Sequence, residues 1–265
     1  MPGKVKLDAV GFCGVDDSVE DPQEIVKLSA LYPFIEWGVL FRPGYEGTPR
    51  HPTPEYAARL GSVLKEAGSV RVAAHMCFED AQRVMRGEVA RVQEVLSMLG
   101  CQRMQVNVGG SPWDKEKGID GLLKVLDSFP DVEFILQTTQ RVQDELLPLL
   151  LQASPRRTNL AVLYDPSCGA GQQPSAWPAP VPGVHCGYAG GLGPQRIVAQ
   201  LQGLANQSLA GYDGAVWIDM ESSLRSVRPE DGRDIFDLSK VKDVISKVTD
   251  ESADATIVPA ALTST

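Results

Sequence analysis

The chain has 265 residues and a formal net charge of −9 at pH 7. This acidic balance disfavours binding to the phosphates of a nucleic acid. With 43% hydrophobic and 22% charged residues, the composition is not that of a disordered chain, and no apolar run approaches the roughly 18 residues of a membrane-spanning helix. We therefore expect neither a nucleic-acid partner nor a membrane partner.

Short apolar runs recur along the chain at fairly even spacing, which is typical of buried strands. We predict strands over Ala9–Cys13, Phe34–Phe41, Val70–His75, Met104–Val108, Val132–Gln137, Leu160–Tyr164, Val184–Tyr188 and Ala215–Ile218. Segments with apolar residues at helical spacing lie between and after these runs. We predict helices within Pro22–Leu31, Thr53–Ala67, Gly87–Leu99, Ile119–Ser128, Val142–Gln152, Pro194–Leu204 and Leu238–Val248.

Strands that alternate with helices must pair in parallel, because each helix is a crossover. Eight such units can close into a barrel, and 265 residues suit that fold, which needs about 250. An open doubly wound sheet is the alternative, but the segment GFCGVDDS after the first run lacks the GxGxxG pattern of a dinucleotide turn. We predict one α/β domain, a (β/α)8 TIM barrel of phosphate-binding type, over residues 1–249, and a flexible tail over residues 250–265.

The five cysteines include no pair with CxxC spacing, and the three histidines show no spacing typical of metal ligands. The first residues, MPGKVKLDAV, lack the apolar core of a signal peptide. We therefore expect reduced thiols, a cytoplasmic protein and no metal site.

Polar or reactive groups follow nearly every predicted strand, where a barrel of this kind places its chemistry. They are Cys13, Arg42, His75, Asn107, Gln137, Asp165, Gly190, Gly191 and Asp219. The thiol of Cys13 is a candidate base or nucleophile if its pKa is lowered, and otherwise a small buried side chain. The carboxyl of Asp165 is a candidate general acid, and otherwise a turn cap.

A candidate phosphate site follows the seventh and eighth strands. Gly190 and Gly191 precede a predicted helix, so their backbone amides can approach an anion closely. Ser222 and Ser223 can complete that cradle from the next loop. Arg42 and Arg50, after the second strand, can each bind a carboxylate or lie free in solvent.

Five segments in this order resemble the phosphoribosylanthranilate isomerase family. They are GFCGVDDSVEDPQEI, FIEWGVLFRPGYEGTPRHPTPEYAARL, LAVLYDPSCGAGQ, GYAGGLGPQRI and WIDMESSLR followed by DIFDLSKVKDVI. The likeness runs through most of the chain, and the agreement in order and spacing makes it more specific than any one motif.

The resemblance implies a cofactor-free Amadori rearrangement of an N-(5-phosphoribosyl) arylamine in tryptophan biosynthesis, catalysed by an aldose–ketose type of isomerase. It implies Cys13 as general base, Asp165 as general acid and Arg50 as the arginine that holds the substrate carboxylate. Gly190, Gly191, Ser222 and Ser223 would hold the phosphate, and Arg42 and Asn107 are further candidates for substrate binding. The expected partner is a small phosphorylated molecule, and the chain is expected to be a monomer or a homodimer.

The sequence departs from the family at several points. The family has a lysine where this chain has Gly11, and its Gln-x-His-Gly pattern after the fourth strand is replaced by NVGG. Glu221 stands where the first serine of the phosphate loop is usual, and its charge would repel phosphate. Extra loops are predicted over Gly110–Lys117, Gln172–Gly183 and Arg225–Arg233.

Two other functions stay open. One is another sugar-phosphate isomerase or epimerase, in which His75 serves as a base or a metal ligand. The other is a barrel that has lost its activity and acts as a sensor or partner protein, since a fold alone does not determine a function.

Overall fold

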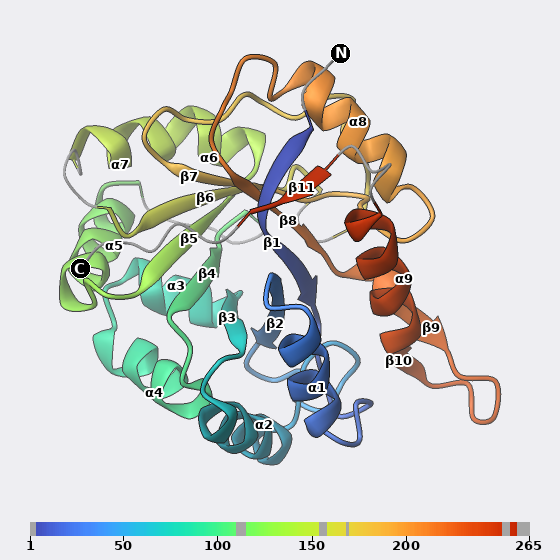
Figure 1. Ribbon diagram of the computed structural model, residues 1–265. Coiled ribbons are helices and arrows are strands. Elements are labelled where there is room, and N and C mark those ends of the chain that lie inside the picture. The colour runs from blue at the N-terminus through green and yellow to red at the C-terminus, as the bar shows by residue number, and fades with distance from the viewer. Residues whose placement is uncertain (1–3, 110–114, 154–157, 168–169, 251–254, 259–265) are drawn as a thin grey trace.

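Parallel strands close into a barrel in the computed structural model, which describes residues 4–109, 115–153, 158–167, 170–250 and 255–258. The ring closes because β1 (Val5–Cys13) pairs with both β2 (Ile35–Phe41) and β8 (Val216–Met220). The remaining strands follow in chain order: β3 (Arg71–Cys77), β4 (Arg103–Asn107), β5 (Glu133–Thr138), β6 (Leu160–Tyr164) and β7 (His185–Tyr188). The predicted (β/α)8 barrel is confirmed (Figure 1).

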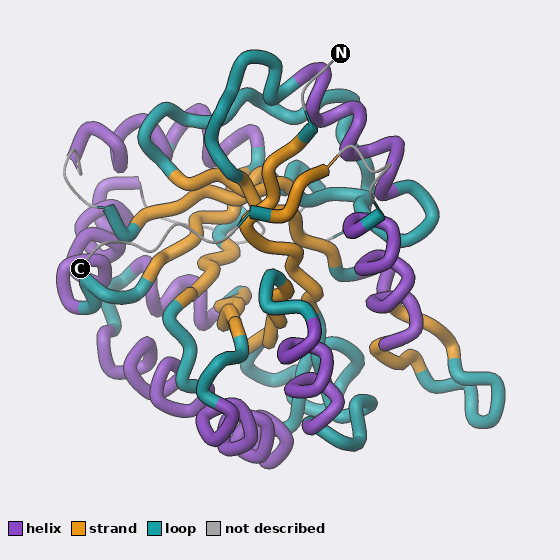
Figure 2. Tube along the Cα trace, in the orientation of Figure 1, coloured by secondary structure: helices purple, strands orange, loops and turns teal. Residues whose placement is uncertain are grey.

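Helices surround the strands on the outside of the barrel (Figure 2). They are α1 (Gln23–Leu31), α2 (Pro54–Ala67), α3 (Glu79–Met85), α4 (Val89–Leu99), α5 (Lys115–Ser128), α6 (Gln140–Glu145), α7 (Leu147–Ala153), α8 (Ile197–Gln207) and α9 (Leu238–Thr249). The units after β3 and β5 each contain two short helices where one was predicted. Gly87, with φ of +73°, separates α3 from α4, and Pro148 in the first turn of α7 cannot donate the hydrogen bond that would continue α6.

The predicted start of α2 is confirmed in detail. The side chain of Thr53 accepts a hydrogen bond of 3.1 Å from the backbone N–H of Tyr56, and Pro54 is the first helical residue. Gly68 ends the helix in the left-handed conformation, with φ of +70°.

The connection between β6 and β7 holds no helix over its described residues, 165–167 and 170–184. The buried ring of Trp177 packs there against Tyr188, with centroids 6.3 Å apart, and its indole N–H donates to the Ala189 carbonyl over 2.8 Å. The hydroxyls of Tyr164 and Tyr188 donate to the carbonyls of Ala179 and Pro178. This loop therefore covers the outer face of β6 and β7, where a helix would otherwise lie.

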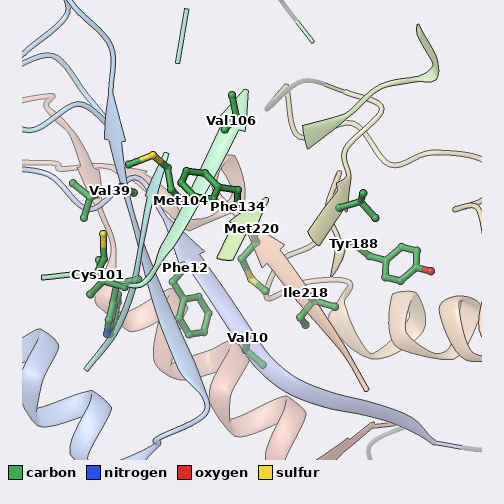
Figure 3. Packing of buried hydrophobic residues seen from close by; sticks show 14 of the residues in the cluster. Val10, Phe12, Val39, Cys101, Met104, Val106, Phe134, Tyr188, Ile218 and Met220 are labelled. Atoms are coloured by element: carbon green, nitrogen blue, oxygen red, sulfur yellow. The ribbon is translucent and has the colours of Figure 1, made fainter. Parts of the chain in front are cut away.

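The buried side chains divide into an outer layer and an interior layer because successive residues of a strand point to opposite faces. Phe12, Met104, Phe134 and Ile218 belong to the large outer cluster between the strands and the helices, as Figure 3 shows. A smaller cluster fills the interior: Ala9, Ile135, Ala161, Leu163, Ala189 and Trp217. Small residues make room there, since a Cβ atom at Gly187 would lie 2.1 Å from the Trp217 ring.

A buried ionic network closes the interior near the amino ends of the strands. Arg103 bonds to Glu36 over 2.5 Å and to Glu133 over 2.6 Å. His185 forms a hydrogen bond of 2.9 Å with Glu133 through Nδ1 and an ion pair of 3.0 Å with Asp8 through Nε2. Although burial opposes its charge, the two carboxylates of Asp8 and Glu133 raise the pKa of His185 to about 9. The network therefore carries a protonated histidine at neutral pH.

The segment predicted to be a flexible tail contains β11 (Ala255–Ile257), which pairs in parallel with Val5–Leu7 of β1. These three residues therefore belong to the sheet, inside the segment that was predicted to be a tail. Because β2 pairs with β1 from Val10 onward, the first residues of β1 leave an open edge, and β11 fills it (Figure 1).

The predicted extra loop after β8 is partly ordered. It forms a hairpin of β9 (Arg225–Val227) and β10 (Asp234–Phe236) that projects from the barrel beside α9 (Figure 1). None of the helices in the described part of the chain is both long and apolar enough to cross a membrane.

Candidate active site at the carboxyl ends of the strands

A cavity of about 820 Å³ lies over the carboxyl ends of the strands. Its wall brings together most of the residues that the sequence singled out: Arg42, Arg50, His75, Asn107, Gln137, Asp165, Gly190, Gly191, Asp219, Ser222 and Ser223. Cys13 is 2% exposed and is not one of the lining residues. Leu40, Leu163, Ala189 and Met220 supply apolar parts of the wall.

Cys13, His75 and Asp219 form a buried cluster next to the cavity. The Cys13 Sγ atom lies 2.7 Å from Oδ1 of Asp219 and 3.6 Å from Nε2 of His75. Two glycines make room for these groups. A Cβ atom at Gly38 would lie 2.4 Å from Sγ, and one at Gly11 would lie 2.3 Å from Oδ1 of Asp219.

The position of Gly11, where the resemblance led to the expectation of a lysine, has no room for a side chain. Any side chain at Gly11 would collide with the carboxyl of Asp219. Asp219 thus takes the space in the barrel interior that a residue larger than glycine would need.

Burial sets the protonation of the cluster. It raises the pKa of Cys13 well above its usual range, and the negative charge of Asp219 acts in the same direction. Burial also raises the pKa of Asp219 to about 7, with contributions from the charges of Glu36, Glu221 and Asp165, and lowers that of His75 to about 3. Cys13 is therefore a neutral thiol that donates to Asp219, whereas the expected role as base requires a lowered pKa.

Asp165 follows β6, and its carboxyl is held by neighbouring donors. Nε2 of Gln137 donates to Oδ2 over 2.9 Å. The hydroxyl and the backbone N–H of Ser167 donate to Oδ1 over 2.8 Å and 3.2 Å. The sequence pointed to Gln137 as a strand-end residue but not to Ser167, although a serine two residues after an aspartate is a common turn pattern.

Arg50 and Glu221 both line the cavity and form an ion pair there. The distance between Nη1 of Arg50 and Oε1 of Glu221 is 2.8 Å. The backbone N–H of Arg50, held at φ of +79°, donates to Asp16 over 2.7 Å, which fixes the loop. Arg50 therefore offsets the Glu221 charge that conflicts with phosphate binding. This differs from the expectation that Arg50 holds a substrate carboxylate, because its guanidinium is already paired.

Arg42 lies in the same cavity wall, where its guanidinium stacks on aromatic rings. Its guanidinium carbon lies 3.5 Å from the ring centre of Tyr45 and 3.8 Å from that of Phe78. The Nε atom is buried and has no hydrogen-bond partner among the described residues. Phe78 has the uncommon φ of +50°. The sequence marked neither aromatic residue, because they belong to separate loops and meet only around Arg42.

The predicted phosphate loop has the backbone that its glycines imply. Gly190 and Gly191 have φ of +97° and +71°, and a Cβ atom at Gly191 would lie 2.7 Å from the backbone nitrogen of Gln173. The hydroxyl of Ser223 donates to the Leu192 carbonyl over 2.6 Å, so it joins the two loops. The helix expected from Pro194 begins at Ile197, after a turn.

Asn107 lines the cavity beside β3. It accepts a hydrogen bond of 2.8 Å from Gln105, and its amide donates to Sγ of Cys77 over 3.2 Å. Both partners are side chains of the barrel interior. Most of the predicted loop Gly110–Lys117 that follows lies outside the described residues.

Comparison with known proteins supports the fold. No protein-family model matches the chain, and no curated protein matches it. Among solved structures, phospho-2-dehydro-3-deoxyheptonate aldolase from Thermotoga maritima matches with a TM-score of 0.51 and 14% identity, over 92% of this chain and 68% of that one. A truncated 3-deoxy-D-arabino-heptulosonate 7-phosphate synthase from the same organism matches with a TM-score of 0.51 and 13% identity, over 96% of this chain and 90% of that one. At this identity the likeness concerns the barrel fold alone.

Proposed function

We propose that the chain is an isomerase of a small phosphorylated substrate, of the phosphoribosylanthranilate isomerase type. The observation that carries this proposal is the pair of carboxyls, Asp165 and Asp219, in the wall of one cavity. Asp165 follows β6 and Asp219 lies in β8, the two strands that flank β7. Burial raises the pKa of Asp219 to about 7, which makes its carboxylate a stronger base. Two carboxyls in one cavity wall are a suitable acid–base pair.

In this mechanism Asp165 protonates the ring oxygen of an N-ribosyl arylamine. The C1–O bond breaks, its electron pair stays on the oxygen, and the nitrogen lone pair forms the C1–N double bond. Asp219 then removes the proton from C2, which gives an enolamine that becomes the ketone. We assign this proton transfer to Asp219 because it lines the cavity, and we assign positioning of its carboxyl to the Cys13 thiol.

The cavity also offers groups for the ends of such a substrate. Gly190, Gly191 and Ser222 lie together in the wall, where backbone amides and a hydroxyl suit a phosphate. Arg42, which stacks between two aromatic rings, suits a carboxylate on an aromatic ring better than the paired Arg50 does.

Turnover of N-(5-phosphoribosyl)anthranilate, followed by the loss of its fluorescence, tests the proposal. The Asp165→Asn and Asp219→Asn variants are each expected to turn over about 100- to 10,000-fold more slowly than the wild type, the usual contribution of a general acid or base. The matched control is Asp213→Asn, since the Asp213 side chain is fully exposed and lies outside the cavity lining.

Three results would contradict the proposal. One is a folded wild-type protein with no turnover of this substrate, and another is full activity in both carboxyl variants. A loss in Asp213→Asn that matches the loss in the site variants would show that the effect does not come from the cavity.

A second candidate function rests on the position of His75 in the cavity wall. A sugar-phosphate isomerase or epimerase can use such a histidine as a base or as a metal ligand. Because burial lowers the pKa of His75 to about 3, it suits a ligand better than a base. Activity on simple aldose phosphates that depends on an added divalent metal would favour this function.

A further inference from the structure

We propose that Cys13, His75 and Asp219 bind a divalent transition-metal ion, with Zn²⁺ as the best match to their donor atoms. The ion would take the thiolate of Cys13, Nε2 of His75 and a carboxylate oxygen of Asp219. This inference goes beyond the proposed isomerase function and does not depend on it, because it concerns the protein without substrate.

The three ligand atoms come together from separate strands. Sγ of Cys13, a nitrogen of His75 and an oxygen of Asp219 all lie within 4.8 Å of one another. They belong to β1, β3 and β8, and each of these side chains is buried. Strand positions of this kind hold ligands more rigidly than loops do.

The distances fit a four-coordinate site with one small adjustment. Zn–S and Zn–N bonds of about 2.3 and 2.0 Å at tetrahedral angles place sulfur and nitrogen about 3.5 Å apart. Cys13 Sγ and His75 Nε2 are 3.6 Å apart. The 2.7 Å contact between Sγ and Asp219 Oδ1 is shorter, so the carboxyl must move away from the sulfur when an ion enters.

The acidic groups around Cys13, His75 and Asp219 favour a cation between these three side chains. A thiol and a carboxyl are in direct contact inside the barrel, and the charges of Glu36 and Glu221 also act on them. A divalent ion would stabilise both groups in their anionic forms, which burial alone disfavours. The neutral imidazole of His75 keeps one ring nitrogen able to coordinate.

The donor set indicates which metal binds and how. One sulfur, one nitrogen and one oxygen form a borderline-soft set that suits Zn²⁺ and disfavours Mg²⁺ or Ca²⁺. His75 and Asp219 line the cavity and Cys13 does not, so the fourth position of the ion would face the cavity. Three protein ligands and one open position are typical of zinc sites that act on a bound molecule.

Metal binding and the acid–base route exclude each other at this cluster. While Asp219 coordinates an ion it cannot accept a proton from the substrate, and Cys13 cannot donate to it. The zinc-loaded protein is therefore expected to lack the isomerase activity proposed above. Bound Zn²⁺ would therefore be compatible with a metal-dependent activity of the cavity and incompatible with the metal-free isomerase activity.

Cobalt substitution tests the site without any activity assay. Protein stripped with a chelator is titrated with Co²⁺, and the thiolate-to-cobalt charge-transfer absorption is followed in the ultraviolet. We expect this band to saturate at one Co²⁺ per chain and to disappear when Zn²⁺ is added. The Cys13→Ser variant should lose the band, and His75→Ala and Asp219→Asn should keep it with affinity reduced more than about 100-fold.

Cys77→Ser is the matched control, because Cys77 is also buried and lines the same cavity but lies outside the cluster. It should keep the band, and a circular-dichroism melt checks that each variant is folded. No band in the wild type, or a band that survives in Cys13→Ser, would overturn the proposal. Loss of the band in the folded Cys77 variant would place the metal elsewhere, whatever the outcome of the isomerase assay.

Discussion

The ionic network around His185 predicts that the free energy of unfolding falls as the pH rises from about 6 to about 9.5. His185 forms ion pairs with Asp8 and Glu133, and its pKa is raised from 6.5 to about 9. A rise of this size corresponds to about 3 kcal/mol of favourable interaction in the protonated form. Because the pKa is raised in the folded state, this stabilisation is complete below pH 6.5 and is lost as the pH passes 9.

The assay is urea unfolding of the wild type and His185→Gln at several pH values in this range. The variant should be less stable than the wild type by about 3 kcal/mol at pH 6, and the difference should nearly vanish by pH 9.5. Buried thiols also weaken folding above about pH 8.5, since thiols ionise more readily in the unfolded chain. Comparing the two proteins removes this effect, because both carry the same cysteines.

His51→Gln is the matched control, since burial lowers the pKa of His51 and no stabilising protonation is expected. A difference between the wild type and His185→Gln that stays constant from pH 6 to 9.5 would refute the reasoning. It would mean that His185 contributes through packing rather than through its charge.

Three further perturbations have expected outcomes. Arg50→Met should lower the free energy of unfolding in urea by about 2 kcal/mol, because it leaves the Glu221 carboxylate without its 2.8 Å partner. Adding Glu221→Gln to this variant should recover most of the lost stability, and a double variant whose loss equals the sum of the two single losses would contradict the pairing. Gly11→Ala should lower the free energy of unfolding, measured by thermal melting, by about 2 kcal/mol and should reduce turnover, because the alanine Cβ atom would lie 2.3 Å from a carboxyl oxygen of Asp219. An unchanged turnover rate would contradict this contact. Trp177→Ala should lower the free energy of unfolding in urea by about 3 kcal/mol, because it removes packing on Tyr188 and a hydrogen bond. A loss below about 1 kcal/mol would show that the loop between β6 and β7 does not take the place of a helix.

The barrel could be predicted from the sequence because each of its strands is marked by a short apolar run of neighbouring residues. Apolar runs such as Leu160–Tyr164 coincide with a strand, and the others are displaced by a few residues. Strand-end side chains could be found in the same way, and Asp165, Gly190 and Asp219 do lie in one cavity wall. β11 was missed because its residues carry no strong strand pattern and are ordered by the open edge of β1.

The contacts within the site could not be read from the sequence. Cys13 and Asp219 are 206 positions apart, and Arg50 and Glu221 are 171 positions apart. Metal-ligand spacing along the chain gave no signal, because each member of the cluster comes from a different strand. The protonation of Cys13 also depended on burial and on a neighbouring carboxyl, neither of which has a sequence signature.

The most direct test of the proposed chemistry is to run the reaction in D₂O and examine the product by NMR. Removal of the C2 proton by Asp219 and reprotonation from the solvent predict one deuterium at C1 of the ketone product. The wild type should form this labelled product, and Asp219→Asn should form it at a greatly reduced rate. A labelled product that Asp219→Asn forms as fast as the wild type would contradict the account, because the C2 proton would then be removed without the Asp219 carboxylate.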